Sequence, residues 1–444
     1  MNLEKIIEKD LCTGCGICIS QDTSNTSTMH IDSNGFYKPL LSDQSSTNAM
    51  SEVCPFNFDN ALNDEDKLAT IFFESNLNTD FRLGKFSNTY IGFSENFRET
   101  SSSGGVGTFI IKELLDKKIV DVVYSIKQIN GNICYAETTK ENNILDQSTT
   151  RYIPVTLEQF FKKIKSENIK AAVTGVGCFI KAIRLKQLAD NEFNNIITIG
   201  IICGGMKSTF YTDYLARKSG CHGEFSNPEY RVKNINSFAL DYSFQCTDNS
   251  SKTIKRIPML EVGDMWGTGL FKAKACDLCD DITSELADIS LGDAWLQPYE
   301  KDGKGNSLII TRNSLFNNII ENGIKSKELV LDTASIEQVY QSQVGAINHK
   351  QKGLKTRVEE LEKISEIKIS KREKYFQETP IEFQSVQKFR VYLRQKSIVL
   401  WKENQEEFDM MIQPDLDTLK SKTKRYHKLG KLRKKFKFLG LCYV

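Results

Sequence analysis

Cysteines are the residues of this chain best suited to chemistry, and there are twelve of them among 444 residues. The N-terminal sequence MNLEKIIEKD is charged and lacks the apolar core of an export signal, so we expect a cytoplasmic protein. In that compartment a disulfide framework is not expected. Metal ligation, redox chemistry and simple burial are therefore the roles to consider for the thiols.

The first group of cysteines has the spacing of an iron–sulfur ligand run. Cys12, Cys15 and Cys18 form C-x2-C-x2-C, the core of the bacterial ferredoxin run C-x2-C-x2-C-x3-C-P. Asp22 stands at the fourth position, but Cys54 precedes a proline, as at the end of a second run. In two-cluster ferredoxins that cysteine ligates the other cluster. We therefore predict one [4Fe–4S] cluster on these four cysteines, with a structural zinc site or unligated thiols as the alternatives.

A second group of four cysteines lies at the ends of expected secondary-structure elements. Cys178 follows a strand expected over 170–174, and Cys203 ends a strand expected over 196–203. Cys276 and Cys279 form a C-x2-C pair further along the chain. The carboxyl ends of parallel strands share one edge of a sheet, where ligands commonly bind. These four side chains can therefore converge although they are distant in sequence.

The elements that would position these cysteines alternate between strand and helix. Short apolar runs predict strands and amphipathic runs predict helices, an order that favours an α/β core over residues 85–335. The expected strands are 119–126, 170–174 and 196–203, and the expected helices are 105–117, 157–165, 179–188 and 208–218. Residues 1–60 form a small ferredoxin-like [4Fe–4S] domain, with a polar linker over 57–66. Residues 350–444 form a helical C-terminal extension with a basic tail.

Several ordered motifs resemble the coenzyme F420 hydrogenase/dehydrogenase beta-subunit family. They run from about residue 8 to 330 and comprise CTGCGIC, SSSGG at 101–105, TTRYIP at 149–154, TGVGC at 174–178, ICGG at 202–205, and CDLC followed by ELADISLGDAW at 285–295. Two positions depart from the usual pattern: Gly177 stands where a proline is usual, and Gly204 where a histidine is frequent. Neither departure removes a cysteine.

The resemblance implies an iron–sulfur flavoprotein oxidoreductase with two [4Fe–4S] clusters and a non-covalent FAD. The TGVGC, ICGG and CDLC cysteines would hold the second cluster, with a four-cysteine zinc site or buried thiols as alternatives. Electrons would pass from ferredoxin or another redox partner protein, through the clusters and FAD, to coenzyme F420 or another small acceptor. Some relatives resemble reductases of polysaccharide biosynthesis. The competing hypothesis is a non-catalytic electron-transfer subunit that docks on a separate catalytic partner. No catalytic residue is assigned.

Three segments are candidates for binding the flavin. A Ser/Gly loop before a helix offers hydroxyls and backbone N–H groups to an anion, although an ordinary capped helix start has the same sequence signature. Arg151 in the TTRYIP segment would place a cation beside a reduced, anionic flavin and stabilise it. The alternative is an arginine that faces solvent. The expected cofactor-binding residues are Ser102, Ser103, Gly104, Gly105, Val106, Thr150, Arg151, Tyr152, Thr174 and Gly175.

Positive charge is concentrated near the C-terminal end of the sequence. The formal net charge is only +2, which gives no indication of a nucleic-acid partner. Residues 420–437, in contrast, contain ten basic and no acidic side chains. A basic amphipathic segment can dock on an anionic membrane surface or an acidic partner. A solvated terminal helix is the alternative, since charge runs are often tails.

Overall fold

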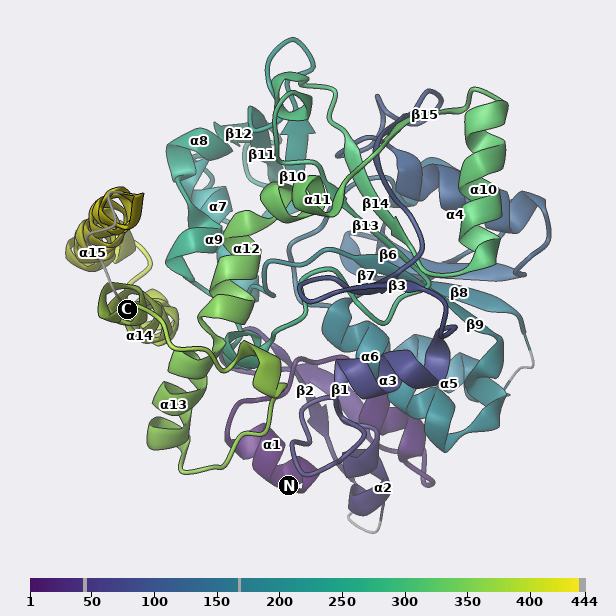
Figure 1. The fold of residues 1–444 in the computed structure, drawn as a ribbon, viewed down its shortest axis with the longest axis horizontal. Coiled ribbons are helices and arrows are strands. Elements are labelled where there is room, and N and C mark those ends of the chain that lie inside the picture. The colour runs from purple at the N-terminus through teal and green to yellow at the C-terminus, as the bar shows by residue number, and fades with distance from the viewer. Residues whose placement is uncertain (43–45, 167–168, 439–444) are drawn as a thin grey trace.

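The centre of the molecule is an eight-stranded mixed sheet (Figure 1). The computed structural model describes residues 1–42, 46–166 and 169–438. The sheet order is β15-β5-β14-β13-β9-β8-β6-β7. The strands are β5 (Thr89–Ser94), β6 (Val122–Ile129), β7 (Asn132–Thr138), β8 (Ala171–Val176), β9 (Ile196–Ile201), β13 (Ile289–Asp293), β14 (Ser307–Thr311) and β15 (Leu329–Thr333).

The four central strands β13, β9, β8 and β6 are parallel, and the outer strands are antiparallel. The predicted α/β core is therefore confirmed, with antiparallel edges that a purely parallel sheet would not have. The β6–β7 hairpin illustrates the local cause. Asn130 and Gly131 both have positive φ, at 50° and 83°, as a two-residue type I′ turn requires.

Helices cover both faces of this sheet (Figure 1). One face packs against α4 (Val106–Asp116) and α10 (Ser314–Lys325), and the other against α5 (Glu158–Ser166) and α6 (Gly177–Ala189). Strand β8 shows the alternation that separates the two cores: Ala172 belongs to the first, and Ala171 and Val173 to the second. Neighbouring side chains of a strand point to opposite faces, so a central strand needs apolar residues throughout.

Residues 1–60 form a small layer beneath α5 and α6 (Figure 1). It contains α1 (Leu3–Glu8), the 3-10 turn η1 (Ile17–Gln21), the antiparallel pair β1 (Thr28–Ile31) and β2 (Tyr37–Leu40), and α2 (Thr47–Glu52). Its backbone bonds directly to the core: Leu157 N–H donates to Cys15 O at 3.1 Å, and Thr209 N–H donates to Gly35 O at 3.0 Å.

The expected linker over 57–66 is wrong for its last residues. Glu65 is 6% exposed at the start of α3 (Glu65–Phe72), where its carboxylate accepts from Lys181 Nζ at 2.9 Å. The polar sequence showed no sign of this buried ion pair. Because of the ion pair, the end of the segment is fixed to α6 of the core.

A second, smaller sheet of β10 (Phe225–Lys233), β11 (Tyr242–Asp248) and β12 (Ile254–Pro258) lies beside α7 (Thr209–Lys218). The short helices α8 (Met259–Val262) and α9 (Met265–Thr268) and the 3-10 turn η4 (Lys274–Leu278) lead from it back to β13. Residues 220–260 therefore consist mainly of strands and the loops that connect them.

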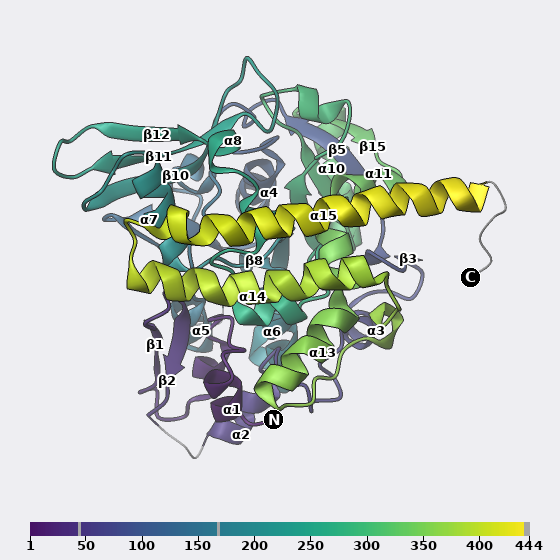
Figure 2. The same ribbon diagram turned by 90° about the vertical axis from the view of Figure 1, so that its left-hand side faces the viewer.

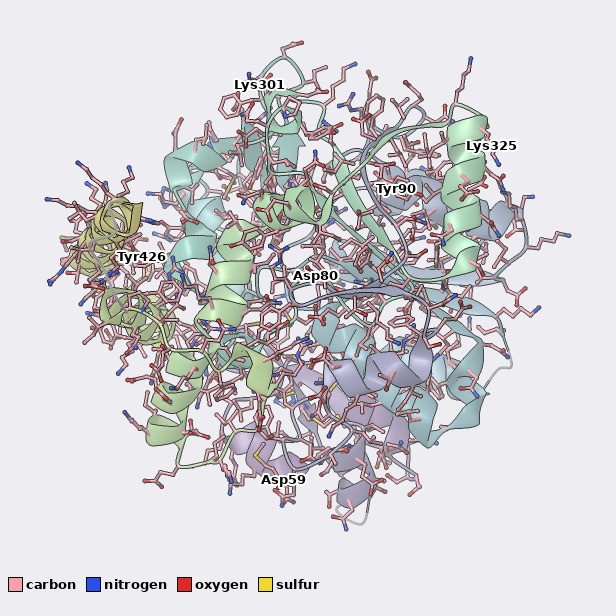
Figure 3. The ribbon with its side chains drawn as sticks, in the orientation of Figure 1. Asp59, Asp80, Tyr90, Lys301, Lys325 and Tyr426 are labelled. Atoms are coloured by element: carbon pink, nitrogen blue, oxygen red, sulfur yellow. The ribbon has the colours of Figure 1, made fainter. Side chains whose placement is uncertain are left out.

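The C-terminal extension is packed along the molecule, as Figure 2 shows. After α11 (Ile336–Ser342), α12 (Val344–Ile347) and the π-helical turn η6 (Asn348–Lys352), the chain forms α13 (Leu354–Ser365) and the antiparallel helices α14 (Ile381–Glu403) and α15 (Phe408–Phe438). Trp401, Phe408 and Leu419 are buried against α7 and the small sheet. Tyr426, labelled in Figure 3, packs on Phe383 with ring centroids 5.1 Å apart.

The C-terminal extension is not helical throughout. Helix α13 ends at Ser365, and Glu366 after it adopts a left-handed φ of 52°. The tail is not a free helix along its whole length: the first half of α15 contributes to the core, while its basic second half extends past α14 (Figure 2). The end of the expected tail, 439–444, lies outside the described residues. Across the described ranges, no helix has the length and apolar character that crossing a bilayer would need.

Candidate functional site

The structure brings the first four cysteines together. Cys15, Cys18 and Cys54 are buried, and Cys12 is partly exposed. Burial raises the pKa of the Cys18 thiol, and its proximity to the other three thiols raises it further. The same combination of burial and neighbouring thiols raises the pKa of Cys15. We call Cys12, Cys15, Cys18 and Cys54 the N-terminal cysteine set.

Backbone N–H groups point at the sulfurs of this set. Gly14 N–H donates to Cys12 Sγ at 3.3 Å, and the N–H groups of Ile17 and Ile19 hydrogen-bond to Cys15 and Cys18. The loop can do this because Gly14 and Gly16 take left-handed φ values of 75° and 80°. Hydrogen bonds to thiolate sulfurs are a normal part of an iron–sulfur site. The residues present therefore fit a [4Fe–4S] cluster.

Asp22, at the position of the missing fourth cysteine, is turned into its own loop. Its carboxylate accepts from the N–H groups of Ser24, Thr26 and Ser27 at 2.7–3.0 Å. Although burial alone would raise its pKa, the hydrogen bonds from Ser24 and Ser27 lower it below the usual range. Asp22 is thus fully engaged in turn formation. Cys54 comes from the end of α2 to complete the set, and Met50, where a second set would need a cysteine, is fully buried in the core.

The second four cysteines also converge. Cys178 lies in the first turn of α6, Cys203 follows β9, and Cys276 and Cys279 lie in and just after η4. Burial raises the pKa of Cys178, and the nearby thiols of Cys276, Cys279 and Cys203 raise it further. We call these residues the inner cysteine set. As predicted from the sheet edge, side chains that are distant in sequence meet in one place.

The inner set also has donors around its sulfurs. Met206 N–H donates to Cys276 Sγ at 3.2 Å, and Lys350 Nζ donates to Cys279 Sγ at 3.3 Å. The unusual Gly177 has a steric reason: a Cβ there would lie 2.2 Å from Asp281 Oδ2. The loop after the CDLC cysteines therefore approaches the start of α6 too closely for a side chain.

The side-chain spacing in both cysteine sets differs from that of the ligands of a single metal ion. Within residues 1–42, 46–166 and 169–438, no three His, Cys, Asp or Glu side chains are arranged to hold one ion. The four thiolates of a [4Fe–4S] cluster bind different corners of a cube, so they stand further apart than the ligands of one ion. Metal analysis, and not this spacing, separates iron from zinc.

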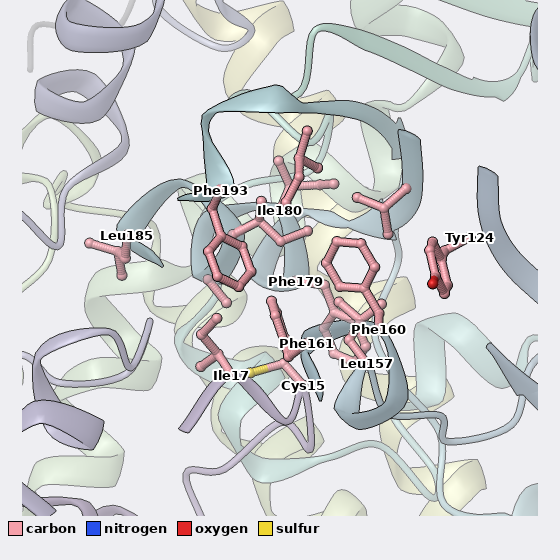
Figure 4. Close-up of a cluster of buried hydrophobic side chains, with 14 of the residues drawn as sticks. Cys15, Ile17, Tyr124, Leu157, Phe160, Phe161, Phe179, Ile180, Leu185 and Phe193 are labelled. Carbon is pink, nitrogen blue, oxygen red and sulfur yellow. The ribbon is translucent and has the colours of Figure 1, made fainter. Parts of the chain in front are cut away.

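The two cysteine sets are neighbours. Cys15 is one of the thiols close enough to Cys178 to raise its pKa. Cys178 also packs against both apolar clusters that surround the N-terminal set, one around Cys15 and one around Cys18 and Cys54. Figure 4 shows Cys15 inside the first of these, beside Leu157 and Phe161. The two cysteine sets therefore form one double site that is surrounded by apolar side chains.

The predicted flavin loop lies at the same sheet edge as the inner set. Gly104 O accepts from Ser94 N–H at 2.8 Å at the end of β5, and Gly92 of β5 pairs with Ser307 at the start of β14. Ser307 in turn pairs with Asp293, the last residue of β13. This end of β13 lies beside the carboxyl ends of β9 and β8, from which the chain continues to Cys203 and Cys178. Register alone thus places the loop and the cysteines on one edge.

The glycines of this loop serve its own packing. A Cβ at Gly104 would lie 2.5 Å from Gly92 O and 2.6 Å from Ser307 N, and one at Gly105 would lie 2.5 Å from the carbonyl carbon of Phe97. Gly105 also has a left-handed φ of 78°, and Val106 after it is fully buried at the start of α4. Glycine is required at Gly104, an expected cofactor-binding residue, because β5 and β14 fill the space that a side chain would take.

The TTRYIP segment contacts the Ser/Gly loop at 101–105. Thr150 N–H donates to Ser102 Oγ at 2.8 Å, while Ser103 Oγ donates to Asn306 O at 3.0 Å. Arg151 is half-buried, its buried Nε has no partner among the described residues, and burial lowers its pKa. Arg151 Nη1 donates to Thr150 O at 3.5 Å, so Nε is the unsatisfied donor of this guanidinium. A buried donor without a partner costs free energy unless an acceptor satisfies it. This orphaned donor fits a flavin phosphate or an anionic ring.

Aromatic rings connect this segment with the inner cysteines. Tyr152 packs edge-on against Trp266 with ring centroids 5.1 Å apart. Trp266 lies beside the Cα of Gly204, where an added Cβ would be 3.5 Å from the indole. Since Gly204 follows Cys203 directly, Trp266 links Tyr152 to the backbone beside the inner set.

Thr174 and Gly175 lie near the end of β8, three or four residues before Cys178. Thr174 O accepts from Tyr135 OH at 2.8 Å, and Thr174 Oγ1 donates to Tyr124 O at 3.4 Å. These contacts hold the strand against β6 and β7. The pair is therefore close to the inner set, with its printed hydrogen bonds directed to neighbouring strands.

Sequence reasoning missed the side chains that the C-terminal extension brings to the inner set. Lys350, Arg357 and Arg394 are all at most 5% exposed. Arg357 Nε donates to Asp277 O at 2.7 Å, and Arg394 Nε pairs with the Asp277 carboxylate at 2.6 Å. The sequence signal for the two arginines was helical spacing: Arg357 shares the buried face of α13 with Leu354 and Leu361, and Arg394 shares that of α14 with Val391 and Ile398. Their charge, in contrast, indicated solvent.

Comparison with known proteins identifies the core. The model of the coenzyme F420 hydrogenase/dehydrogenase beta subunit N-terminal domain matches residues 89–162, and the model of its C-terminal domain matches residues 169–337. Among curated proteins none matches the chain. Among solved structures, a chain of the xenon-derivatised F420-reducing [NiFe] hydrogenase complex from Methanosarcina barkeri has 18% sequence identity and a TM-score of 0.47, covering 62% of this chain and 94% of that chain.

Together the two models span more than half of the chain and include the candidate flavin segments and the inner cysteine set. The N-terminal cysteine set and the C-terminal extension lie outside them. The chain belongs to the coenzyme F420 hydrogenase/dehydrogenase beta-subunit family.

Proposed function

We propose that the chain is an iron–sulfur flavoprotein oxidoreductase that passes electrons from a ferredoxin-type donor to a small acceptor. One [4Fe–4S] cluster would bind the N-terminal cysteine set, a second the inner set, and FAD the edge formed by the Ser102 loop and Arg151. The observation that supports this most is the convergence of two four-cysteine sets that adjoin each other. When bound, the clusters supply one-electron transfer and the flavin couples it to two-electron chemistry.

The protein's own contribution would be positioning and charge. The N-terminal layer docks on α5 through backbone hydrogen bonds, which fixes one cysteine set against the other. Apolar side chains around Cys15 and Cys178 exclude water from the space between the sets. Arg151 would satisfy an anion of the flavin. The acceptor class is proposed from the family description, and coenzyme F420 is the first candidate.

The test is anaerobic purification followed by iron, sulfide and flavin quantitation and an acceptor screen. We expect iron and sulfide for two clusters, one FAD, and reduction of the flavin by dithionite or reduced ferredoxin. Turnover of F420 or another small acceptor by the chain alone would support an enzyme. Turnover only with a second subunit would support the alternative, an electron-transfer subunit. Zinc in place of iron, or protein without flavin, would contradict the proposal.

Replacing Arg151 by glutamine should weaken FAD binding at least tenfold, which corresponds to about 1.4 kcal/mol. The variant loses a charge-assisted hydrogen bond to the flavin, and such bonds contribute about 1.5–3 kcal/mol. Flavin release is measured by fluorescence during dilution. Arg256→Gln, on the exposed side of β12, is the matched control and should bind FAD normally. Equal FAD affinity in both variants would rule out Arg151 as a flavin ligand.

A further inference from the structure

Lys350 is a buried lysine at the inner cysteine set that comes from outside the family-matched residues. It lies in η6, thirteen residues beyond the end of the C-terminal domain match, and is 2% exposed. Its Nζ donates to Cys279 Sγ at 3.3 Å and to Asp281 O at 2.7 Å. The ammonium thus contacts a candidate cluster ligand directly.

The inner cysteine set supplies the ionisable groups that affect this ammonium most strongly. Among the described residues, no carboxylate oxygen lies within ion-pair distance of Lys350 Nζ, although the Asp281 carboxyl is in the vicinity. Burial on its own lowers the pKa of Lys350, whereas Cys279, Cys203 and Cys276 raise it. An isolated buried cation is costly. Its place in the core is understandable when the four thiols ligate a cluster of net negative charge.

Neighbouring contacts fix the position of Lys350. Arg357 Nη2 donates to Lys350 O at 3.0 Å, and the Arg357 Nε bond to Asp277 O joins the same turn to the CDLC loop. His349 Nε2 and Nδ1 lie 3.0 Å from Lys272 Nζ and 2.8 Å from Gln387 Oε1. Since the turn is tied on both sides, the ammonium cannot swing to solvent.

Building on the proposed function, we propose that Lys350 sets the reduction potential of the inner cluster. The potential of an iron–sulfur cluster depends on net charge, on hydrogen bonds to its sulfurs and on solvent exposure. Reduction adds one electron from the donor and no proton, because Lys350 is already charged. A fixed positive charge beside Cys279 and Cys203 favours the more negative, reduced state, so it raises the potential of the inner cluster.

The experiment is an EPR-monitored redox titration of the anaerobically purified full chain with dithionite. Lys350→Met removes the charge with little change in volume. At a given potential we expect the ratio of reduced to oxidised inner cluster to fall about tenfold, which is about 59 mV for a one-electron couple. Lys350→Arg should stay near the native potential. The control, Lys352→Met, changes an exposed lysine of the same turn whose Nζ lies 3.4 Å from Tyr426 OH, and should show no shift.

Iron quantitation separates the possible failures. If Lys350→Met keeps its inner-site iron and its potential, the proposal is wrong. If Lys350→Met does not load iron, Lys350→Gln, which keeps a donor toward Asp281 O, takes its place and must show the same fall. If both neutral variants lose iron while Lys350→Arg retains it, Lys350 assembles the site and does not set its potential. Native protein without inner-site iron would overturn the proposed function itself, and this inference with it.

Discussion

Alanine in place of Cys54 should remove about half of the iron and sulfide from the anaerobically purified protein and leave FAD in place. Cys54 completes the N-terminal set, and a [4Fe–4S] cluster with three thiolates and no replacement ligand is readily lost. The inner set and the flavin edge are built from other elements, so their cofactors should remain. Iron, sulfide and flavin quantitation give the answer, and the EPR signal that remains identifies the surviving cluster.

Two control variants make this result specific. Asp22→Ala should keep all the iron, because the Asp22 carboxylate is engaged by the N–H groups of its own turn. Cys134→Ala removes a thiol of β7 that belongs to neither set, and should also keep it. Iron that falls in the Asp22 variant but not in the Cys54 variant would mean that the first run supplies its own fourth ligand.

Replacing Arg372 by methionine should lower the free energy of unfolding by about 3–5 kcal/mol, the cost of removing one partner of a buried ion pair. The Arg372 side chain is 2% exposed. Its guanidinium donates to Glu285 at 2.7 and 3.0 Å and to Asp280 at 2.9 Å. Asp280 keeps Lys371 as a second partner at 2.9 Å, whereas Glu285 has no other ion pair in the described part of the chain.

The loss of unfolding free energy in the Arg372 variant should depend on pH. Burial raises the pKa of Glu285, and Arg372 opposes the shift. Without the arginine the carboxyl is held further above its unfolded pKa, so stability is lost as the pH rises and Glu285 ionises. The deficit measured by urea unfolding should therefore be larger at pH 8 than at pH 6. Lys374→Met is the control, since Lys374 pairs with half-exposed Asp66 and should cost under about 1 kcal/mol. Equal losses in both variants would contradict the argument.

The sequence was most informative where apolar periodicity decides the fold. Expected strands over 170–174 and 196–203 correspond to β8 and β9, and the expected helices that follow them to α6 and α7. Buried central strands and amphipathic helices leave a pattern that needs no knowledge of tertiary contacts. The meeting of Cys178 and Cys203 followed from the same pattern, because the carboxyl ends of parallel strands share an edge.

The remaining features depend on contacts that no local pattern encodes. Lys350, Arg357 and Arg372 lie in a stretch rich in Lys and Glu, which by composition indicates solvent, yet all three are buried. Gly104 was expected to face a ligand, but β5 and β14 occupy the space beside it. The three charged side chains bond to residues 69 to 87 positions away, and Ser307 beside Gly104 comes from the distant strand β14. Only the assembled fold reveals what these residues do.

The arginine contacts that join the C-terminal extension to the CDLC region have a consequence for biosynthesis. A ribosome makes the chain from its N-terminus, and domains fold in that order, so the segment holding Arg357, Arg372 and Arg394 emerges last. Until it docks, the CDLC loop lacks the three guanidinium groups that fasten Asp277, Asp280 and Glu285. During this interval the inner cysteine set is less enclosed than in the finished fold, which is when the proposed inner cluster would be inserted most readily. Docking of α13 and α14 then brings Arg357 and Arg394 onto Asp277 and encloses the inner cysteine set.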